Sequence, residues 1–328
     1  IFILSLLITF YSWHSTQANI RQQASEKFRQ DTEHIMRSIQ ERVRRYTDTL
    51  YSGQGFFAAS RSVERNEWET FIKTQNLLSR YTGIIAFRYI ERVKASQKEE
   101  FIQSVRSDTS VLPAGYPAFN IYPEGEREEY FVVKYLVPYS GNEKMLGLDL
   151  GSEKVRKASL LQARELNEPM MTERIVLVTS QKNEPAVLIT LPVFRNGAPV
   201  ITAQERQEAL VGFVDVACRV QDIVADIIDE EPLNTNIEFM IFDSPVSAAS
   251  FSDVEPLYDS GWKDKSEKTH KDVFHASLTY DFTIAGQVWR LYFHSDINSS
   301  LDPTQRFYPL FVLIAGFFFS VLLFGLIY

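Results

Sequence analysis

The pattern of hydrophobic positions is most uniform at the end of the chain. Residues 307–328, FYPLFVLIAGFFFSVLLFGLIY, contain no charged residue. A helix rises 1.5 Å per residue, so a run of this length crosses the roughly 30 Å hydrocarbon core of a membrane. Every face of the run is apolar, which is typical of a membrane span and not of an amphipathic surface helix. The sequence therefore predicts a transmembrane helix at residues 307–328.

The chain also begins with an apolar run, residues 1–13, IFILSLLITFYSW. This run is shorter than the roughly 20 residues that a span needs, and it lacks the basic region of a signal peptide. We interpret residues 1–13 as the end of a first transmembrane helix in a longer protein. That protein is expected to continue beyond Tyr328 into an output domain, with residues 14–306 lying between the two spans.

The segment after the first span predicts one long amphipathic helix, because apolar side chains recur in steps of three, four or their sums. These residues are Ile20, Ala24, Phe28, Ile35, Ile39, Val43, Tyr46 and Leu50. A sustained narrow stripe packs either on a partner helix or along its own domain. We expect residues 14–80 to form this stalk helix and a second helix. We also expect a homodimer whose seam is the stripe, so that charged substitutions at Ile35 and Ile39 weaken self-association.

From Gly83 onward the pattern changes to short runs rich in branched and aromatic residues, which is typical of strands. Six runs come first, and four more follow a helical stripe near residues 220–228. The runs are GIIAFRYIERV, YFVVKYLV, KMLGLDL, ERIVLV, AVLITLPVF and ALVGFVDV, then IEFMIFD, PLYDS, FHASLTYDFTI and QVWRLYF. Two strand groups with helices predict an α+β fold of two sheet subdomains. We place a membrane-distal subdomain at residues 81–217 and a membrane-proximal one at residues 218–306.

The predicted strand KMLGLDL contains one carboxylate, Asp149, between two leucines, and Ser152 follows as the expected N-cap of a helix. A charge in such a position is unfavourable unless it faces solvent or has a partner. One interpretation is a half-exposed strand with Asp149 in water. The other is a pocket in which Asp149 accepts a hydrogen bond from a ligand.

Composition excludes several classes of function. The formal net charge of −8 and the lack of a Lys/Arg-rich run argue against a nucleic-acid partner. The single cysteine, Cys218, cannot form an internal disulfide, which fits a bacterial periplasmic domain. The chain has no Gly-x-Ser-x-Gly, no phosphate-binding glycine loop and no His-Glu-x-x-His, and its histidines are scattered. We therefore expect no catalytic residues, no metal ion and no cofactor in this segment.

Several blocks together resemble the CHASE domain over residues 81–230. They are REEY from Arg127, MLGLDLGSEKVRKASLLQARE, MMTERIVLV, LITLPVF and LVGFVDV, and the later PLYDSGW and VWRLYF are similar to bacterial members. This domain is the extracytoplasmic sensory module of membrane receptors such as histidine kinases and nucleotide cyclases, including plant cytokinin receptors. The resemblance implies a long stalk helix and two tandem PAS-like sheets between two membrane helices, with the ligand in the membrane-distal sheet.

The resemblance also implies a ligand-binding site. In cytokinin-binding relatives, the aspartate that matches Asp149 bonds the adenine ring, while the backbone matching Met171 and the side chain matching Thr190 complete the polar contacts. Met171 replaces a leucine, and the residues before Asp149 differ from the plant pattern, so the ligand is left open, with adenine derivatives first to be tried.

We therefore expect the sensory region of a multi-pass receptor in the bacterial inner membrane, with residues 14–306 periplasmic and a small molecule as ligand. The expected output is a histidine kinase, followed by a diguanylate or adenylate cyclase. Two other classes stay open. One is a membrane-anchored periplasmic hydrolase. The other is a dimerisation spacer in which side chains fill the space around Asp149.

Overall fold

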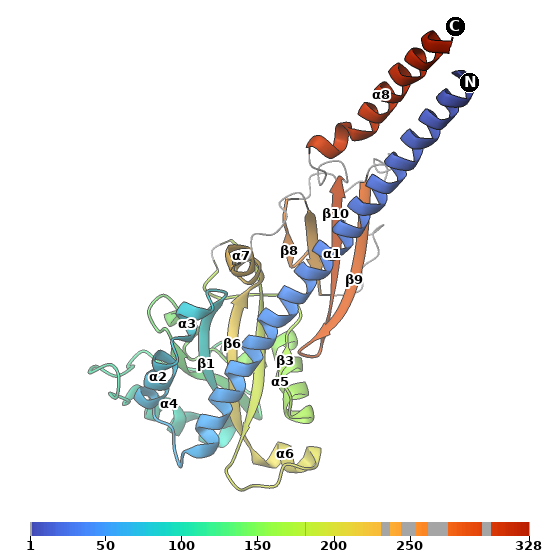
Figure 1. Ribbon diagram of the computed structural model, residues 1–328. Coiled ribbons are helices and arrows are strands. Elements are labelled where there is room, and N and C mark those ends of the chain that lie inside the picture. Colours follow the sequence, from blue (N-terminus) through green and yellow to red (C-terminus); the bar gives the residue numbers. More distant parts are fainter. Residues whose placement is uncertain are drawn as a thin grey trace.

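The computed structural model describes residues 2–180, 182–230, 237–243, 254–261, 275–296 and 303–327. Helix α1 (Phe2–Ala59) runs the length of the molecule and lies along two β-sheets (Figure 1). At one end it pairs with helix α8 (Pro303–Ile327), so that the two ends of the chain lie side by side. The chain therefore ends beside the place where it begins.

Helix α1 buries the predicted apolar stripe against its own chain. The buried apolar members are Ala24, Phe28, Ile35, Ile39, Val43, Tyr46 and Leu50. All of them except Ala24 join one hydrophobic core with strands of both sheets and with helix α7 (Val220–Glu230). Of the two alternatives for the stripe, packing along its own domain is therefore the observed one. Ile35 and Ile39 are core residues, so the expectation that charges there would report on a dimer seam is wrong.

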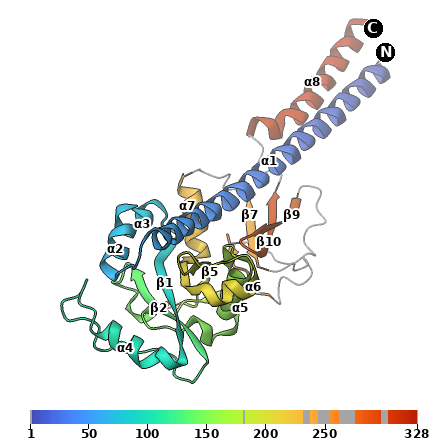
Figure 2. The same ribbon diagram turned by 90° about the horizontal axis from the view of Figure 1, so that it is seen from below.

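The first sheet is antiparallel, with strand order β2-β1-β6-β5-β3 and the short strand β4 also paired to β5. Its strands are β1 (Ile84–Lys94), β2 (Glu129–Val137), β3 (Met170–Met171), β4 (Ile175–Val176), β5 (Pro185–Phe194) and β6 (Leu210–Arg219). Figure 2 shows α1 crossing one side of this sheet. The described helices around it, besides α1 and α7, are α2 (Arg65–Thr74), α3 (Leu77–Arg80), α4 (Lys98–Arg106), α5 (Lys154–Leu166) and α6 (Ala203–Ala209).

The second sheet is also antiparallel, in the order β8-β7-β10-β9. Its strands are β7 (Glu238–Phe242), β8 (Tyr258–Asp259), β9 (His275–Ile284) and β10 (Gln287–Asp296). The tip of the β9–β10 hairpin reaches the first sheet, where the backbone N–H of Met171 donates to the carbonyl oxygen of Ala285 at 2.7 Å. The predicted α+β class, with a long N-terminal helix and antiparallel sheets, is confirmed.

Two of the predicted strands are wrong in extent. KMLGLDL is an irregular segment between the 3₁₀ turns Glu143–Met145 and Leu150–Ser152, with single bridges at Leu148 and Asp149. Gly147 has φ +83°, a left-handed conformation that a strand does not contain, and a Cβ there would collide with the carbonyl oxygen of Asn120. In ERIVLV, only Ile175–Val176 pairs as a strand.

Among the described residues, one helix is long and apolar enough to cross a membrane, Phe307–Leu326, with a mean hydropathy of 2.5. The beginning of α1 packs against it: the rings of Phe2 and Phe324 lie 5.3 Å apart, and Thr9 lies against Gly316. One candidate span is thus found, and the second span expected at residues 1–13 stays a prediction.

The pairing of α1 with α8 predicts a specific crosslink. A Cβ built on Gly316 would lie 3.0 Å from the Cβ of Thr9, near the separation of about 3.5–4.5 Å found in disulfides. We expect the double variant Thr9→Cys/Gly316→Cys to form an intramolecular disulfide on mild oxidation in membranes. The measurement is a mobility shift on non-reducing gels, with Thr9→Cys/Leu326→Cys as the mismatched control. Equal crosslinking in both variants would contradict the observed pairing.

Candidate ligand-binding site

A row of polar side chains crosses the face of the first sheet away from α1. The register places Arg88 of β1 opposite Asp215 of β6, and Asp215 opposite Thr190 of β5. Arg88 donates from Nε and Nη2 to the two carboxylate oxygens of Asp215, at 2.8 and 2.5 Å. Both side chains are at most 1% exposed. A bidentate pair of this kind satisfies a buried charge that would otherwise be very unfavourable.

Asp149 lies beyond the outer edge of β2 and is fully buried, so the interpretation in which it faces water is wrong. Its Oδ1 accepts the backbone N–H groups of Phe131 (2.8 Å) and Gly151 (2.9 Å). Its Oδ2 has no hydrogen-bond partner among the described residues and lies 3.5 Å from Nε of Arg127. Burial raises the pKa of Asp149, while the two backbone hydrogen bonds and the charges of Arg127 and Lys157 oppose that rise.

The helix after Asp149 begins one residue later than predicted. Glu153, and not Ser152, is the N-cap of α5, and its carboxylate accepts the N–H groups of Val155 and Arg156. The hydroxyl of Ser152 instead donates to the carbonyl oxygen of Asp149 at 2.6 Å. The polar groups of this turn therefore hold the backbone of Asp149 in place.

Thr190 and Met171 lie on paired strands at the other end of the row. Thr190 is fully buried, and its Oγ1 has no hydrogen-bond partner among the described residues. The side chain of Met171 points to the α1 face and joins the core there. Its backbone N–H bonds Ala285, and its carbonyl oxygen accepts from Nε2 of Gln287 at 3.1 Å. Both backbone groups of Met171 are thus occupied by the β9–β10 hairpin.

The structure brings Thr190 and Met171 together, but Asp149 comes from the opposite edge, with β2, β1 and β6 between. Side chains of the same chain cover the face between them. Met145 lies with its sulfur 3.8 Å from Nη1 of Arg88, and the rings of Phe131 and Phe213 meet edge to face at 5.6 Å. Only a ligand that spans this face, after these side chains move, would contact all three residues.

Arg88 and Asp215 are site residues that the sequence analysis did not single out. The signal was present, because Asp215 is a lone carboxylate inside the apolar run LVGFVDV, just as Asp149 is inside its own run. Arg88 likewise interrupts the apolar run GIIAFRYIERV. A charge within the apolar part of each of two strands of one sheet indicates that the charges pair across the ladder.

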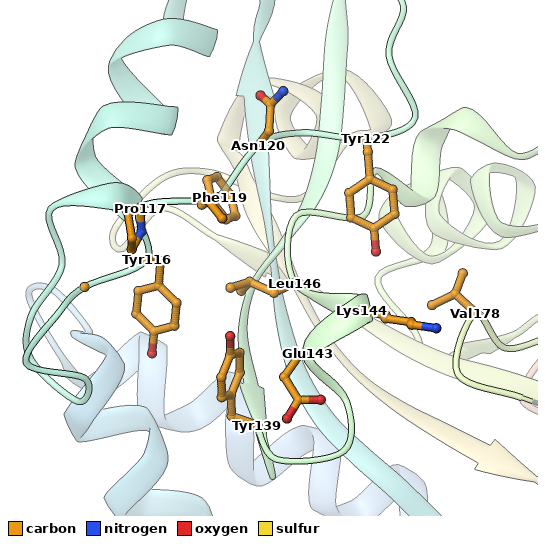
Figure 3. A pocket seen from close by; sticks show the side chains of 12 residues that line it. Tyr116, Pro117, Phe119, Asn120, Tyr122, Tyr139, Glu143, Lys144, Leu146 and Val178 are labelled. Atoms are coloured by element: carbon orange, nitrogen blue, oxygen red, sulfur yellow. The ribbon is translucent and has the colours of Figure 1, made fainter.

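A cavity of about 520 Å³ opens beside this face (Figure 3). Its walls include Tyr116, Phe119, Tyr122, Tyr139, Lys144 and Leu146. It is separated from Asp149 by the backbone at Tyr122, whose carbonyl oxygen accepts the N–H of Asp149 at 2.8 Å. The volume is within the range of small-molecule sites, roughly 300–1,000 Å³.

Tyr122 lines the cavity, and the charge of Arg156 acts on it from outside the lining. The hydroxyl of Tyr122 is buried and has no hydrogen-bond partner among the described residues. Burial raises the pKa of Tyr122, and the nearby charges of Arg88 and Arg156 oppose that rise. Nη2 of Arg156 donates to the carbonyl oxygen of Val176 at 2.8 Å, and burial together with the charge of Arg88 lowers the pKa of Arg156.

The described residues contain no group of three or more His, Cys, Asp or Glu side chains placed to hold a metal ion. The buried thiol of Cys218 belongs to the core, and burial raises its pKa, which makes it unreactive.

A family model of the CHASE domain matches residues 61–252, more than half of the chain. The chain belongs to the CHASE domain family, which confirms the resemblance and extends it at both ends. Family membership supports an extracytoplasmic ligand-sensing region of a receptor.

Two solved structures are similar to the chain. An extracellular ligand-binding receptor from Desulfohalobium retbaense DSM5692 is 11% identical, with a TM-score of 0.40, over 84% of this chain and 39% of that one. The chain thus spans about two fifths of that receptor's length. The periplasmic sensory domain of the Campylobacter jejuni chemoreceptor Tlp1 is 12% identical, with a TM-score of 0.43, over 87% of this chain and 96% of that one. No curated protein matches the chain in sequence.

Proposed function

We propose that this chain binds a small molecule on the face of the first sheet and transmits a conformational signal through α8 to a cytoplasmic output domain. One observation carries the proposal. Asp149 Oδ2 and Thr190 Oγ1 are both buried without a hydrogen-bond partner among the described residues, on one sheet of a CHASE domain. A buried polar atom without a partner costs free energy, roughly 1–3 kcal/mol, which a ligand donor would recover.

The first ligand class to test is adenine derivatives, because an adenine ring presents N–H donors at its edge and an apolar plane. An N–H donor would meet Oδ2 of Asp149, and the plane would replace Met145 against the sheet. The segment 145–150 covers this face, so ligand entry requires that segment to move. Binding then favours a conformation in which it is displaced.

The β9–β10 hairpin supports a route for the signal. Its tip bonds both backbone groups of Met171, on the strand next to Thr190, and Gly286 lies against Met170. Nearby, the N–H of Arg174 donates at 2.6 Å to Asp243, which directly follows strand β7 of the second sheet. A shift of strand β3 would therefore move the second sheet, which precedes α8 in the chain.

The finer features of the proposal follow the family. The two sheets act as tandem PAS-like subdomains, residues 81–217 and 218–306, between two membrane spans at residues 1–13 and 307–328. Two copies associate in the bacterial inner membrane, with residues 14–306 in the periplasm. The output is a histidine kinase, with a diguanylate or adenylate cyclase as the alternative.

A second function, a spacer that binds no ligand, is favoured by one observation: the face between Asp149 and Thr190 is closed by the chain's own side chains. A hydrolase has less support, because the histidines whose side chains the structure describes, at 14, 34 and 294, lie on α1 and on the second sheet. A nucleophile on the first sheet would have none of these as its base.

The variant Asp149→Asn separates a ligand-binding role from a structural one. Its side-chain carbonyl retains the two hydrogen bonds that Oδ1 accepts, so we expect the stability of the free chain to stay within about 1 kcal/mol of wild type. Binding of adenine or an N6-substituted adenine should weaken about ten- to a hundredfold, because a charge-assisted hydrogen bond is lost. The measurements are thermal unfolding and calorimetric titration of the full chain in detergent micelles.

The matched control is Asp149→Ala, which leaves the N–H groups of Phe131 and Gly151 without an acceptor and should cost about 2–4 kcal/mol of stability.

The pH dependence of the stability gives a further check. Burial raises the folded-state pKa of Asp149 above the unfolded value near ~3.9, so its ionisation lowers stability as pH rises from about 4 through the folded pKa. Asp149→Asn removes that decline. Unchanged adenine affinity in Asp149→Asn, or no adenine binding by wild type, would favour the spacer.

A further inference from the structure

The cavity beside Tyr122 has two chemically different ends. Aromatic rings form one end, where Tyr116 and Tyr139 meet edge to face at 5.7 Å (Figure 3). At the other end, the hydroxyl of Tyr122 and the side chain of Lys144 point toward the same corner, beside Val178 (Figure 3). Such a site presents a flat apolar surface and a localised polar corner to one ligand.

The aromatic end is held rigidly from behind. The guanidinium of Arg65 lies 4.2 Å from the centre of the Tyr116 ring, and Arg65 is itself fixed by an ion pair with Asp108 at 2.6 Å. Phe119 packs edge to face on Phe101 at 5.9 Å. Rings whose positions are fixed before binding lose little entropy when a planar ligand stacks on them.

The polar corner carries positive charge that lacks a partner. Lys144 forms no ion pair or hydrogen bond with a described residue, and the Tyr122 hydroxyl is buried without a partner. Behind them, Arg156 holds the backbone at Val176, two residues before Val178, and forms no ion pair with a described residue. Arg88 contributes no net charge here because Asp215 neutralises it.

One carboxylate lines the cavity, and a second lies near Arg156. Glu143 also lines the cavity and accepts the N–H of Gly141 at 2.9 Å, while Glu153 caps α5 and attracts the charge of Arg156. Glu143 would repel an acid placed beside it. An acidic ligand is therefore oriented with its charge toward Lys144 and Tyr122, and its apolar body toward Tyr116 and Tyr139.

We propose that this cavity is a second ligand site, which binds a planar organic carboxylate. The carboxylate is held by Nζ of Lys144 and the hydroxyl of Tyr122, with the charge of Arg156 behind them, and the aromatic body of the ligand packs among Tyr116, Phe119 and Tyr139. The site is distinct from the face that contains Asp149 and Thr190, so it goes beyond the function proposed above, and its test can fail or succeed independently of the adenine test.

The test uses the full chain in detergent micelles with three probe acids, benzoate, phenylacetate and cinnamate, each compared with its primary amide. We expect at least one acid to raise the unfolding temperature and to bind by titration at millimolar concentration or below, and its amide to bind at least tenfold more weakly. Lys144→Met should weaken binding of that acid about ten- to a hundredfold, and Tyr122→Phe about tenfold.

Matched variants test whether the loss of acid binding is specific to the cavity residues. Lys154→Met removes the same charge from an exposed position on α5 and should change the acid affinity by less than twofold. Glu143→Gln should leave the affinity unchanged or raise it. Tyr122→Phe and Lys144→Met remove groups that have no described partner, so both should unfold at the wild-type temperature without ligand.

Three outcomes would overturn the proposal: no acid binding below 10 mM, equal binding of an acid and its amide, or an equal loss in Lys154→Met. None of these outcomes bears on adenine binding at Asp149. Conversely, loss of adenine binding in Asp149→Asn with intact acid binding would leave both sites standing as separate sites.

Discussion

Replacing Arg88 with methionine is expected to destabilise the chain by about 3–5 kcal/mol. The substitution keeps a long side chain but leaves Asp215 fully buried without its bidentate partner. Removing one member of a buried ion pair is strongly unfavourable because the remaining charge is uncompensated. The measurement is the free energy of unfolding of the full chain in detergent, obtained from denaturant titration.

The double variant Arg88→Met/Asp215→Leu provides the control, because replacing both charges by apolar groups is often close to neutral. We expect it to recover most of the lost stability.

The stability of the single variant Arg88→Met should also depend on pH. Burial already raises the pKa of Asp215 and Arg88 opposes that rise, so removal of Arg88 raises the pKa further. The deficit of Arg88→Met should therefore shrink as pH falls from 7 toward 4, since protonated Asp215 needs no counter-charge. A pH-independent deficit would contradict this account.

Replacing Ile39 with aspartate is expected to cost more than about 4 kcal/mol and to prevent folding at ordinary temperature. Ile39 is 1% exposed and packs in the core that α1 shares with both sheets. The substitution removes apolar contacts and buries a carboxylate with no partner, which is among the most destabilising changes known. Circular dichroism during thermal unfolding of the full chain gives the readout.

Gln23→Asp, on the exposed surface of the same helix, is the matched control and should change stability by no more than about 0.5 kcal/mol. Light scattering of both variants distinguishes the present account from a dimer seam at this stripe. A seam would give half the mass with an unchanged unfolding temperature in Ile39→Asp. We expect instead that Ile39→Asp loses its folded structure, and that no loss of association occurs while the unfolding temperature is unchanged.

The amphipathic period of α1 was predictable from the sequence, but its packing partner was not. Residues such as Ile35 and Ile39 repeat at helical spacing whatever surface covers them. The covering strands, β5, β6 and β9, begin more than 120 residues later in the chain. Local periodicity carries no information about which of two surfaces lies opposite, because that choice depends on the whole topology.

The candidate site was likewise predictable from the sequence only in part. A carboxylate between leucines correctly indicated an unusual environment at Asp149, since such a charge needs compensation. The compensation itself depends on the left-handed turn at Gly147 and on Oδ1 accepting two backbone N–H groups, which alternation along a strand does not reveal. At Met171 the missing information is non-local, because residues 285 and 287 of a distant hairpin occupy its backbone groups.

The single unbroken helix α1 has a consequence for how this receptor segment keeps its angular alignment. Its 58 residues span about 87 Å, and the same helix both meets α8 near Thr9 and enters the core at Ala24. One residue inserted between these two points would turn the α8-facing side by about 100° relative to the sheets, whereas seven residues would restore it to within about 20°. The number of residues between Thr9 and Ala24 therefore fixes the rotation of the α8-facing side relative to the sheets. Natural length changes in that stretch are expected in steps close to whole heptads.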